Sequence, residues 1–180
     1  MQTFKSSRGF SLIEVMVASA ILGCAVLSIA QLVAAATGST AGARGVSEAT
    51  LLAWQKIDQL RSLAFAFDDA GGPVTDASTD TATEPERALG GTGLAPSPGG
   101  TLGRDTGGYV DYLDAFGQSL GGGALGGSDS PPRGTRYRRR WAVGLAGGNP
   151  DVLILRVRVL DTARDETLAG ATTIRTRRRP

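Results

Sequence analysis

Residues 6–26 read SSRGFSLIEVMVASAILGCAV, and this stretch decides how the chain is organised. It opens an apolar run from Phe10 to Ala36 in which Glu14 is the only fully charged side chain. A helix needs about 20 apolar residues to cross a bilayer, so this run is long enough to span one. An ionisable group inside a membrane segment is costly to place there, and Glu14 therefore indicates a function.

Three interpretations of this run follow from its flanks and its length. Lys5 and Arg8 precede it, and this placement predicts that the start of the chain stays in the cytoplasm while the remainder is exported. A secretory signal peptide, cut after Ala36, would use a hydrophobic core of only about 7–15 residues. A plain single-pass anchor accounts for the length of the run and leaves Glu14 unexplained. The third interpretation assigns a role to Glu14.

The eight residues from Arg8 to Val15, RGFSLIEV, resemble the processing site of type IV pilins and type II secretion pseudopilins. That family has a short basic leader ending in glycine, followed by an aromatic residue, a small hydroxyl residue, two aliphatic residues and a glutamate. The resemblance implies that a prepilin peptidase removes the leader, residues 1–9, between Gly9 and Phe10. It also implies N-methylation of Phe10, a single pass through the inner membrane with the body in the periplasm, and incorporation into a filament with other pilins.

The resemblance gives Glu14 a partner in a neighbouring subunit. Cleavage leaves the amino group of Phe10 as a positive charge at the membrane boundary, where Glu14 of the next subunit can meet it. Two charges that are costly alone in a low-dielectric bundle become tolerable as a pair. Such a pair would set the axial register between helices whose surfaces are otherwise uniformly apolar. The alternative is a carboxylate that reaches the membrane surface without any partner.

The helix is expected to continue beyond the membrane as a spine over residues 10–67, with residues 10–36 spanning the bilayer. No proline occurs before Pro73. An apolar stripe with spacings of three and four residues predicts an amphipathic second half that docks on a soluble domain, with Glu48, Lys56, Asp58 and Arg61 off the stripe. The stripe consists of Val46, Ala49, Ala53, Ile57, Leu60, Ala64 and Phe67.

Residues 68–134 are rich in glycine, proline and aspartate, which favours a connecting region of loops and turns. Within it, Tyr109–Leu113 is expected to form a short strand or hairpin, with a turn near Asp114–Gly117. Carboxylates are the ligands that calcium prefers, but the spacing of the acids that open this region is not that of an EF-hand. No metal or cofactor is therefore expected. These acids are Asp68, Asp69, Asp76 and Asp80.

Residues 135–180 are expected to form an antiparallel β-sheet. Three runs, TRYRRRWAVGL (135–145), VLILRVRVLD (152–161) and ATTIRTRRR (171–179), are separated by turn residues, and their side chains alternate in character. The apolar face of this sheet would cover the stripe of the helix. The predicted fold is therefore α+β and pilin-like, with a long N-terminal helix packed on a small C-terminal sheet.

The net charge of +2 conceals a strong segregation of charge along the chain. Residues 68–132 hold two arginines and ten acids, whereas residues 133–180 hold twelve arginines and four acids. The acidic segment, 68–132, and the basic segment, 133–180, form the two poles of the chain. They either attract each other within the fold or leave the basic pole facing a partner. Ten arginines are candidates for one basic sheet face that would contact nucleic acid or a neighbouring subunit. They are Arg136, Arg138, Arg139, Arg140, Arg156, Arg158, Arg175, Arg177, Arg178 and Arg179.

Composition argues against an enzyme. The chain has no histidine, which removes the commonest general base and the commonest zinc ligand, and one cysteine, which excludes an internal disulfide. It also lacks a glycine-rich phosphate loop and a G-x-S-x-G nucleophile elbow. Residues 47–65 resemble the spine of PilV-type minor pilins and I-type minor pseudopilins, so a structural minor subunit is the expected function. The alternatives are a DNA-binding minor pilin that uses Arg136, Arg138, Arg139 and Arg140, and a secreted binding domain released by signal peptidase after Ala36.

Overall fold

The computed structural model describes residues 9, 11–122 and 130–178 of the 180-residue chain. One long helix, α1, runs from Leu12 to Ser62. It begins where the Ser11 carbonyl accepts hydrogen bonds from the backbone N–H groups of Glu14, at 3.0 Å, and Val15, at 3.2 Å. The chain divides into two compact units, residues 1–44 and 45–180, so the first part of α1 belongs to one unit and the rest to the other.

In the first unit, apolar side chains cover α1 and are exposed, as at Leu12, Met16 and Leu32. Three of its hydroxyl groups form hydrogen bonds with the helix backbone. The hydroxyls of Ser28, Thr37 and Thr40 donate to backbone carbonyls three or four residues earlier, at 2.8–3.0 Å. These bonds satisfy the hydroxyl groups without water. Among the described residues, α1 is the helix that is long enough and apolar enough to cross a membrane.

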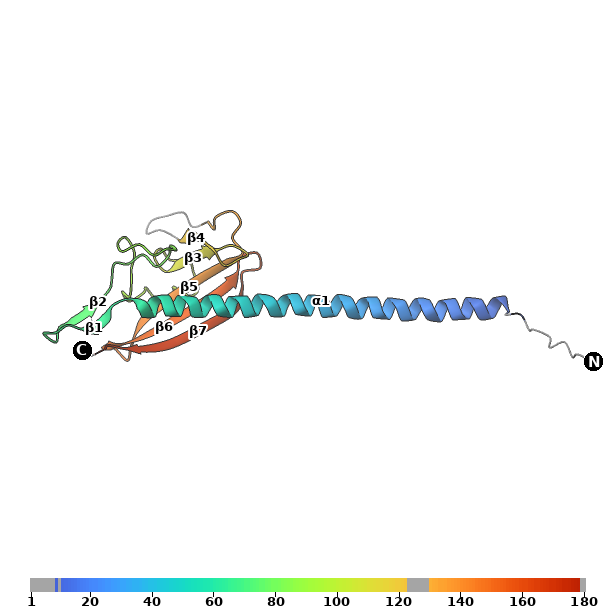
Figure 1. The fold of residues 1–180 in the computed structure, drawn as a ribbon, viewed down its shortest axis with the longest axis horizontal. Helices are drawn as coiled ribbons and strands as arrows, with labels where there is room; N and C mark the ends of the chain where they lie inside the picture. The colour runs from blue at the N-terminus through green and yellow to red at the C-terminus, as the bar shows by residue number, and fades with distance from the viewer. Residues whose placement is uncertain (1–8, 10, 123–129, 179–180) are drawn as a thin grey trace, which may run out of the picture. The chain divides into compact units, whose positions relative to one another are not determined.

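The second unit contains two antiparallel sheets (Figure 1). The smaller pairs β1 with β2, and the larger has five strands in the order β4-β3-β5-β6-β7. The strand bounds are Phe65–Phe67 for β1, Pro73–Thr75 for β2, Val110–Leu113 for β3, Ser119–Gly122 for β4, Tyr137–Ala146 for β5, Asn149–Asp161 for β6 and Glu166–Thr176 for β7.

The core lies between the large sheet and the second half of α1. Alternate residues of each strand point to the same face of a sheet, and most inward-facing residues of β5 and β6 are apolar, with Arg139 and Asp161 as buried polar exceptions. They pack against a helix face of small and aliphatic side chains, which confirms the α+β prediction. This core consists mainly of Ala49, Ala53, Ile57 and Leu60 from α1 and Trp141, Val143, Leu153, Leu155, Val157 and Val159 from the sheet.

The helix ends at Ser62, five residues before the predicted end at Phe67. Phe65–Phe67 forms β1 instead, because these residues pair with β2. The guanidinium of Arg175 donates to the carbonyls of Leu60, at 2.9 Å, and Leu63, at 2.5 Å. The last carbonyls of a helix have no partner within it, so Arg175 on β7 stabilises the end of α1 from outside.

The connecting region, residues 68–134, contributes two strands to the large sheet. Its strands β3 and β4 belong to the large sheet, because β3 pairs with β5 along its whole length. The expected hairpin and turn are confirmed. The carboxylate of Asp114 accepts hydrogen bonds from the N–H groups of Phe116, at 2.8 Å, and Gln118, at 2.9 Å, while Gly117 takes a positive φ of 77° that few other residues adopt.

Aspartates at the start of the connecting region hold its turns. Asp68 accepts hydrogen bonds from the N–H groups of Ala70 and Gly72, and Asp76 accepts three from Ser78 and Thr79. Burial raises the pKa of Asp76, but the three hydrogen bonds together outweigh this effect and hold that pKa below its ordinary value. In the described residues no group of three or more acidic or cysteine side chains is placed to hold a metal ion.

Candidate functional site

The N-terminal segment places Glu14 in the first turn of α1, where the helix dipole favours a negative charge. Its side chain is exposed and borders a shallow surface hollow with Val15, Ala18, Ser19 and Leu22. Within this chain no described residue is placed to neutralise the carboxylate, because no ion pair joins Glu14 to a described base. An ionised group surrounded by an apolar medium is costly unless it is paired.

Gly9 is exposed, and a Cβ atom added there would meet no described atom within 4 Å. Packing among the described residues therefore does not require glycine at this position. A demand for glycine from outside the chain, such as entry of an extended backbone into a protease cleft, would explain it. The other residues of the predicted cleavage and topology signal, Lys5, Arg8 and Phe10, lie outside the described residues.

The four arginines predicted as contacts to nucleic acid or a subunit each pair with an aspartate of this chain. Arg139 and Arg140 are buried, and Arg136 is about half exposed, with 48% of its side chain accessible. The acidic and basic poles of the sequence thus attract each other within the fold. The pairs are Arg136 with Asp161 at 3.2 Å, Arg138 with Asp105 at 3.2 Å and Asp165 at 3.0 Å, Arg139 with Asp111 at 2.8 Å, and Arg140 with Asp105 at 2.6 Å.

The expectation of a single basic sheet face is wrong. Successive strand residues point to opposite faces, so Arg139 faces α1 while its neighbours Arg138 and Arg140 face the other way. Arg175 also faces α1, where it stabilises the helix end. Arg177 lies with its guanidinium carbon 4.2 Å from the ring centre of Phe65 and pairs with Asp151 at 2.8 Å. Most of the cluster is therefore engaged in holding the body together.

A buried charge network joins α1 to the sheet, and sequence analysis missed its central residue. The ammonium of Lys56 lies 2.7 Å from a carboxylate oxygen of Asp111 and donates to the carbonyl of Thr81 at 2.5 Å. It also lies 4.1 Å from the ring centre of Trp141. Asp111 binds the guanidinium of Arg139 through both oxygens, at 3.0 and 2.8 Å. Lys56, Asp111 and Arg139 are all buried.

Electrostatics set the protonation of this network. Burial lowers the pKa of Lys56 to about 8, with Asp111 opposing this effect and Arg139 adding to it. Burial alone would raise the pKa of Asp111, but the charges of Arg139 and Lys56 outweigh it and hold that pKa below its usual range. At neutral pH the network therefore carries two positive charges and one negative charge. Such a network fixes the register between α1, β3 and β5.

The spacing of Lys56 could have identified it as buried. It lies three residues after Ala53 and four before Leu60, which are the spacings of the apolar stripe. Sequence analysis places Lys56 off the apolar stripe, and buried lysines are rare unless they are paired. Its partner Asp111 lies 55 residues later in the sequence, within the acidic region.

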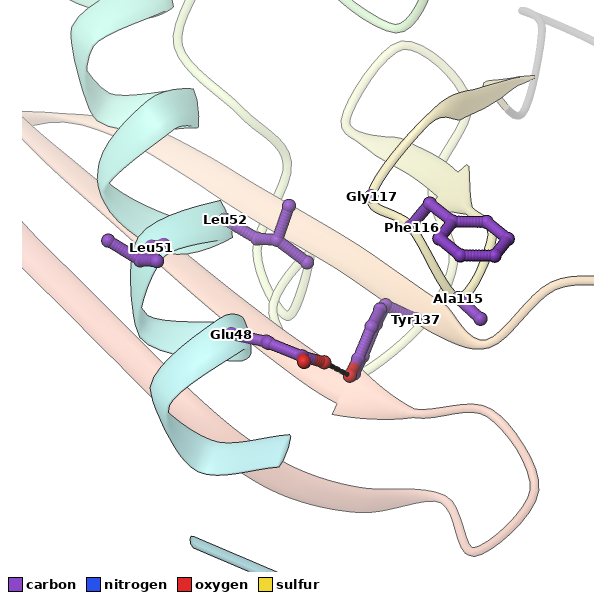
Figure 2. Close-up of a pocket in the computed structure, with 7 residues that line it drawn as sticks. All are labelled: Glu48, Leu51, Leu52, Ala115, Phe116, Gly117 and Tyr137. Atoms are coloured by element: carbon purple, nitrogen blue, oxygen red, sulfur yellow. Dashed lines mark hydrogen bonds between the residues drawn. The ribbon is translucent and has the colours of Figure 1, made fainter. Parts of the chain in front are cut away.

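A surface notch of about 290 Å³ lies beside α1 in the second unit. Figure 2 shows Glu48, Leu51 and Leu52 on the helix and Ala115, Phe116 and Gly117 on the β3–β4 turn, with Tyr137 between them. The hydroxyl of Tyr137 donates to the Glu48 carboxylate at 2.6 Å. The notch therefore has mainly apolar walls and a single carboxylate.

Comparison with known proteins gives one match, at the N-terminus. Residues 4–30 match the family model of the prokaryotic N-terminal methylation motif. Neither the curated proteins nor the solved structures yield a match to this chain. The matched segment contains Gly9, Phe10 and Glu14 and leads into the apolar first half of α1. The methylation motif therefore stands at the head of an apolar helix that continues into an α+β, pilin-like fold.

Proposed function

We propose that this chain is a non-enzymatic structural subunit, a minor pilin or minor pseudopilin, of a type IV pilus or type II secretion filament. The observation that carries the proposal is the match to the methylation motif over residues 4–30, which includes the start of an exposed apolar helix with a carboxylate in its first turn. A prepilin peptidase cuts between Gly9 and Phe10 and methylates the new N-terminus, leaving residues 10–180 as the mature subunit. Lys5 and Arg8 keep the leader on the cytoplasmic side during this step.

Assembly then depends on the first unit. Its apolar side chains are exposed in the isolated chain and need a membrane before assembly and neighbouring helices afterwards. Glu14 pairs with the Phe10 amine of the adjacent subunit, and this pair selects one axial register among helices that would otherwise slide. The periplasmic body, residues 45–180, remains attached to the helix and forms the surface of the filament.

The minor class is favoured by two features of the body. The chain has a single cysteine, Cys24, so it lacks the paired C-terminal cysteines that many major type IV pilins carry. Residues 47–65 resemble the spine of PilV-type minor pilins and I-type minor pseudopilins, and in this chain the part up to Ser62 is helical and carries one face of the core.

The test is the mature N-terminus of the full chain expressed in cells that carry a prepilin peptidase. Intact mass and N-terminal sequencing are expected to give a chain that starts at methylated Phe10. A start at Thr37 would instead mean a domain released by signal peptidase, and an uncut chain would mean a simple membrane anchor. Cells without the peptidase provide the control, because there the leader should stay attached.

A further inference from the structure

The notch beside α1 presents a carboxylate without an ion-pair partner, and apolar side chains that are left exposed, among the described residues of the chain. Phe116 is 88% exposed and Leu51 is 71% exposed. The Glu48 carboxylate accepts a hydrogen bond from Tyr137, but no ion pair joins it to a described base. The Asp114 turn fixes the backbone at Phe116, so the aromatic ring is presented from a well-defined position. We call Glu48, Leu51 and Phe116 the acidic notch.

A second unpartnered surface lies on the opposite face of the large sheet. There the segment before β3 covers the β5 side, where Asp105 pairs with Arg140 and Ser97 bonds to Val143. The same segment reaches β6, where Arg158 donates to the carbonyl of Leu102, but side chains farther along β6 and on β7 remain exposed. Arg156 and Thr172, which are paired across the strands, are exposed, and the adjacent Ile174 is 64% exposed. We call Arg156, Thr172 and Ile174 the outer patch.

Arg156 differs from the arginines of β5 in having no acid beside it. Each of Arg138, Arg139 and Arg140 has an aspartate within 4 Å, whereas no ion pair joins Arg156 to a described carboxylate. The outer patch thus presents one uncompensated cation next to an exposed aliphatic side chain. The acidic notch presents one uncompensated anion next to exposed apolar side chains. The two surfaces are complementary in charge and alike in apolar character.

We propose that the acidic notch of one copy of this chain binds the outer patch of a second copy. In this contact the guanidinium of Arg156 pairs with the Glu48 carboxylate, and Ile174 packs against Phe116 and Leu51. The two surfaces lie on opposite sides of the sheet, so the contact is heterologous and each copy keeps one free surface of each kind. A heterologous contact that does not close into a ring extends in one direction, as a filament requires.

This contact is expected to be weak in isolation. It contains one exposed ion pair, worth at most about 1 kcal/mol, and a few exposed apolar side chains. Anchoring of the first unit in a membrane or bundle raises the effective concentration of neighbouring bodies, so a weak contact suffices there. The proposal therefore names a partner surface beyond the helix-based assembly proposed above, and it concerns only residues of the second unit.

Directional disulfide cross-linking tests this contact in membranes of cells that produce the full chain and a prepilin peptidase. Cys24 is the only cysteine, so a Cys24→Ala background leaves the introduced thiols as the sole reactive ones. Cells co-produce two tagged versions, one carrying Leu51→Cys and the other Thr172→Cys. A cross-linked dimer that contains both tags is expected under mild oxidation. Either variant produced alone should give little dimer, because the contact joins unlike surfaces.

Charge reversal then tests the ion pair. Glu48→Arg in the Leu51→Cys copy should reduce the mixed dimer about fivefold, the effect expected from an exposed pair worth about 1 kcal/mol. Arg156→Glu in the other copy should restore it. Matched controls are Asp58→Arg and Arg164→Glu, which reverse exposed charges outside both surfaces and should leave the yield unchanged.

The contact is overturned if the mixed dimer is no more abundant than the dimers of each variant alone, or if reversal of both charges fails to restore the yield. Sequencing of the N-terminus in the same membranes separates this result from the proposed function. Methylated Phe10 without the mixed dimer would support the proposed function and rule out the contact. A mixed dimer with an unprocessed N-terminus would retain the contact and remove the proposed maturation.

Discussion

The buried network predicts that two substitutions of neighbouring charged residues will differ greatly in their effect on stability. Asp111→Asn removes the negative charge of the Lys56–Asp111–Arg139 network and leaves the cations of Lys56 and Arg139 buried together. Removing one partner of a buried ion pair costs about 3–5 kcal/mol, because the remaining charge is uncompensated. Here two cations lose their counterion, so the free energy of unfolding should fall by at least that amount.

Lys56→Met should cost far less. It leaves Asp111 paired with Arg139, so the network becomes electrically neutral. The carbonyl of Thr81 loses its donor, at about 1–3 kcal/mol, and the contact with the Trp141 ring, worth about 1–2 kcal/mol, also disappears. Removal of the buried ammonium offsets these losses, since its lowered pKa of about 8 corresponds to a burial penalty on the order of 3 kcal/mol. The net change is expected to lie within about 1–2 kcal/mol of zero.

The assay is urea unfolding of the full chain in detergent micelles, followed by tryptophan fluorescence. Trp141 is buried beside Lys56, whereas Trp54 is half exposed, so a Trp54→Phe background makes the signal report on the network. Asp58→Asn serves as the control, because it removes an exposed acid from the same helix and should change stability by less than about 0.5 kcal/mol. A loss from Lys56→Met equal to that from Asp111→Asn would refute the charge balance described here.

Further predictions concern the pH dependence of the buried network, the end of α1 and the N-terminal motif. The folded-state pKa of Lys56, about 8, lies below its unfolded value of 10.5, so the unfolded chain binds the extra proton between these values. Stability should therefore rise from pH 8 towards pH 10, by up to about 2–3 kcal/mol, and Lys56→Met should flatten this rise in unfolding curves measured at each pH. Arg175→Met should lower the unfolding free energy by about 1–3 kcal/mol and increase hydrogen exchange at the end of α1, since two helix carbonyls lose their donor; unchanged exchange there would contradict the proposed cap. Glu14→Ala should leave N-terminal processing intact while lowering the amount of the subunit in purified filaments, whereas Gly9→Val should block processing, both read by immunoblot and intact mass. Normal incorporation of the Glu14→Ala chain would remove the role assigned to its carboxylate.

Periodic patterns in the sequence were sufficient to predict the helix and the last three strands. The stripe through Ala49, Ala53 and Leu60 recurs at helical spacing, and Leu155 and Val157 alternate with arginines as a half-buried strand requires. Such patterns depend only on neighbours in the sequence. They identify which face of an element is buried without needing to identify its partner.

The features that sequence analysis missed depend on residues far apart in the chain. The end of α1 at Ser62 results from β1–β2 pairing and from Arg175, which lies more than a hundred residues later. Burial of Lys56 depends on Asp111, and the distribution of the arginines depends on which face each strand turns towards α1. Local propensity contains no information about these partners, and tertiary pairing decides the outcome.

Three carboxylates of this chain differ in whether a cation of the same chain neutralises them, and this difference bears on their roles. Asp111 is buried and is held there by two cations of the same chain, so folding alone accounts for it. Glu48 has a hydroxyl donor and no cation, and Glu14 has neither among the described residues. A carboxylate in water needs no counterion, but one that enters a filament core or a subunit contact does. Under the two proposals made above, Glu14 and Glu48 are the carboxylates whose partners belong to another subunit.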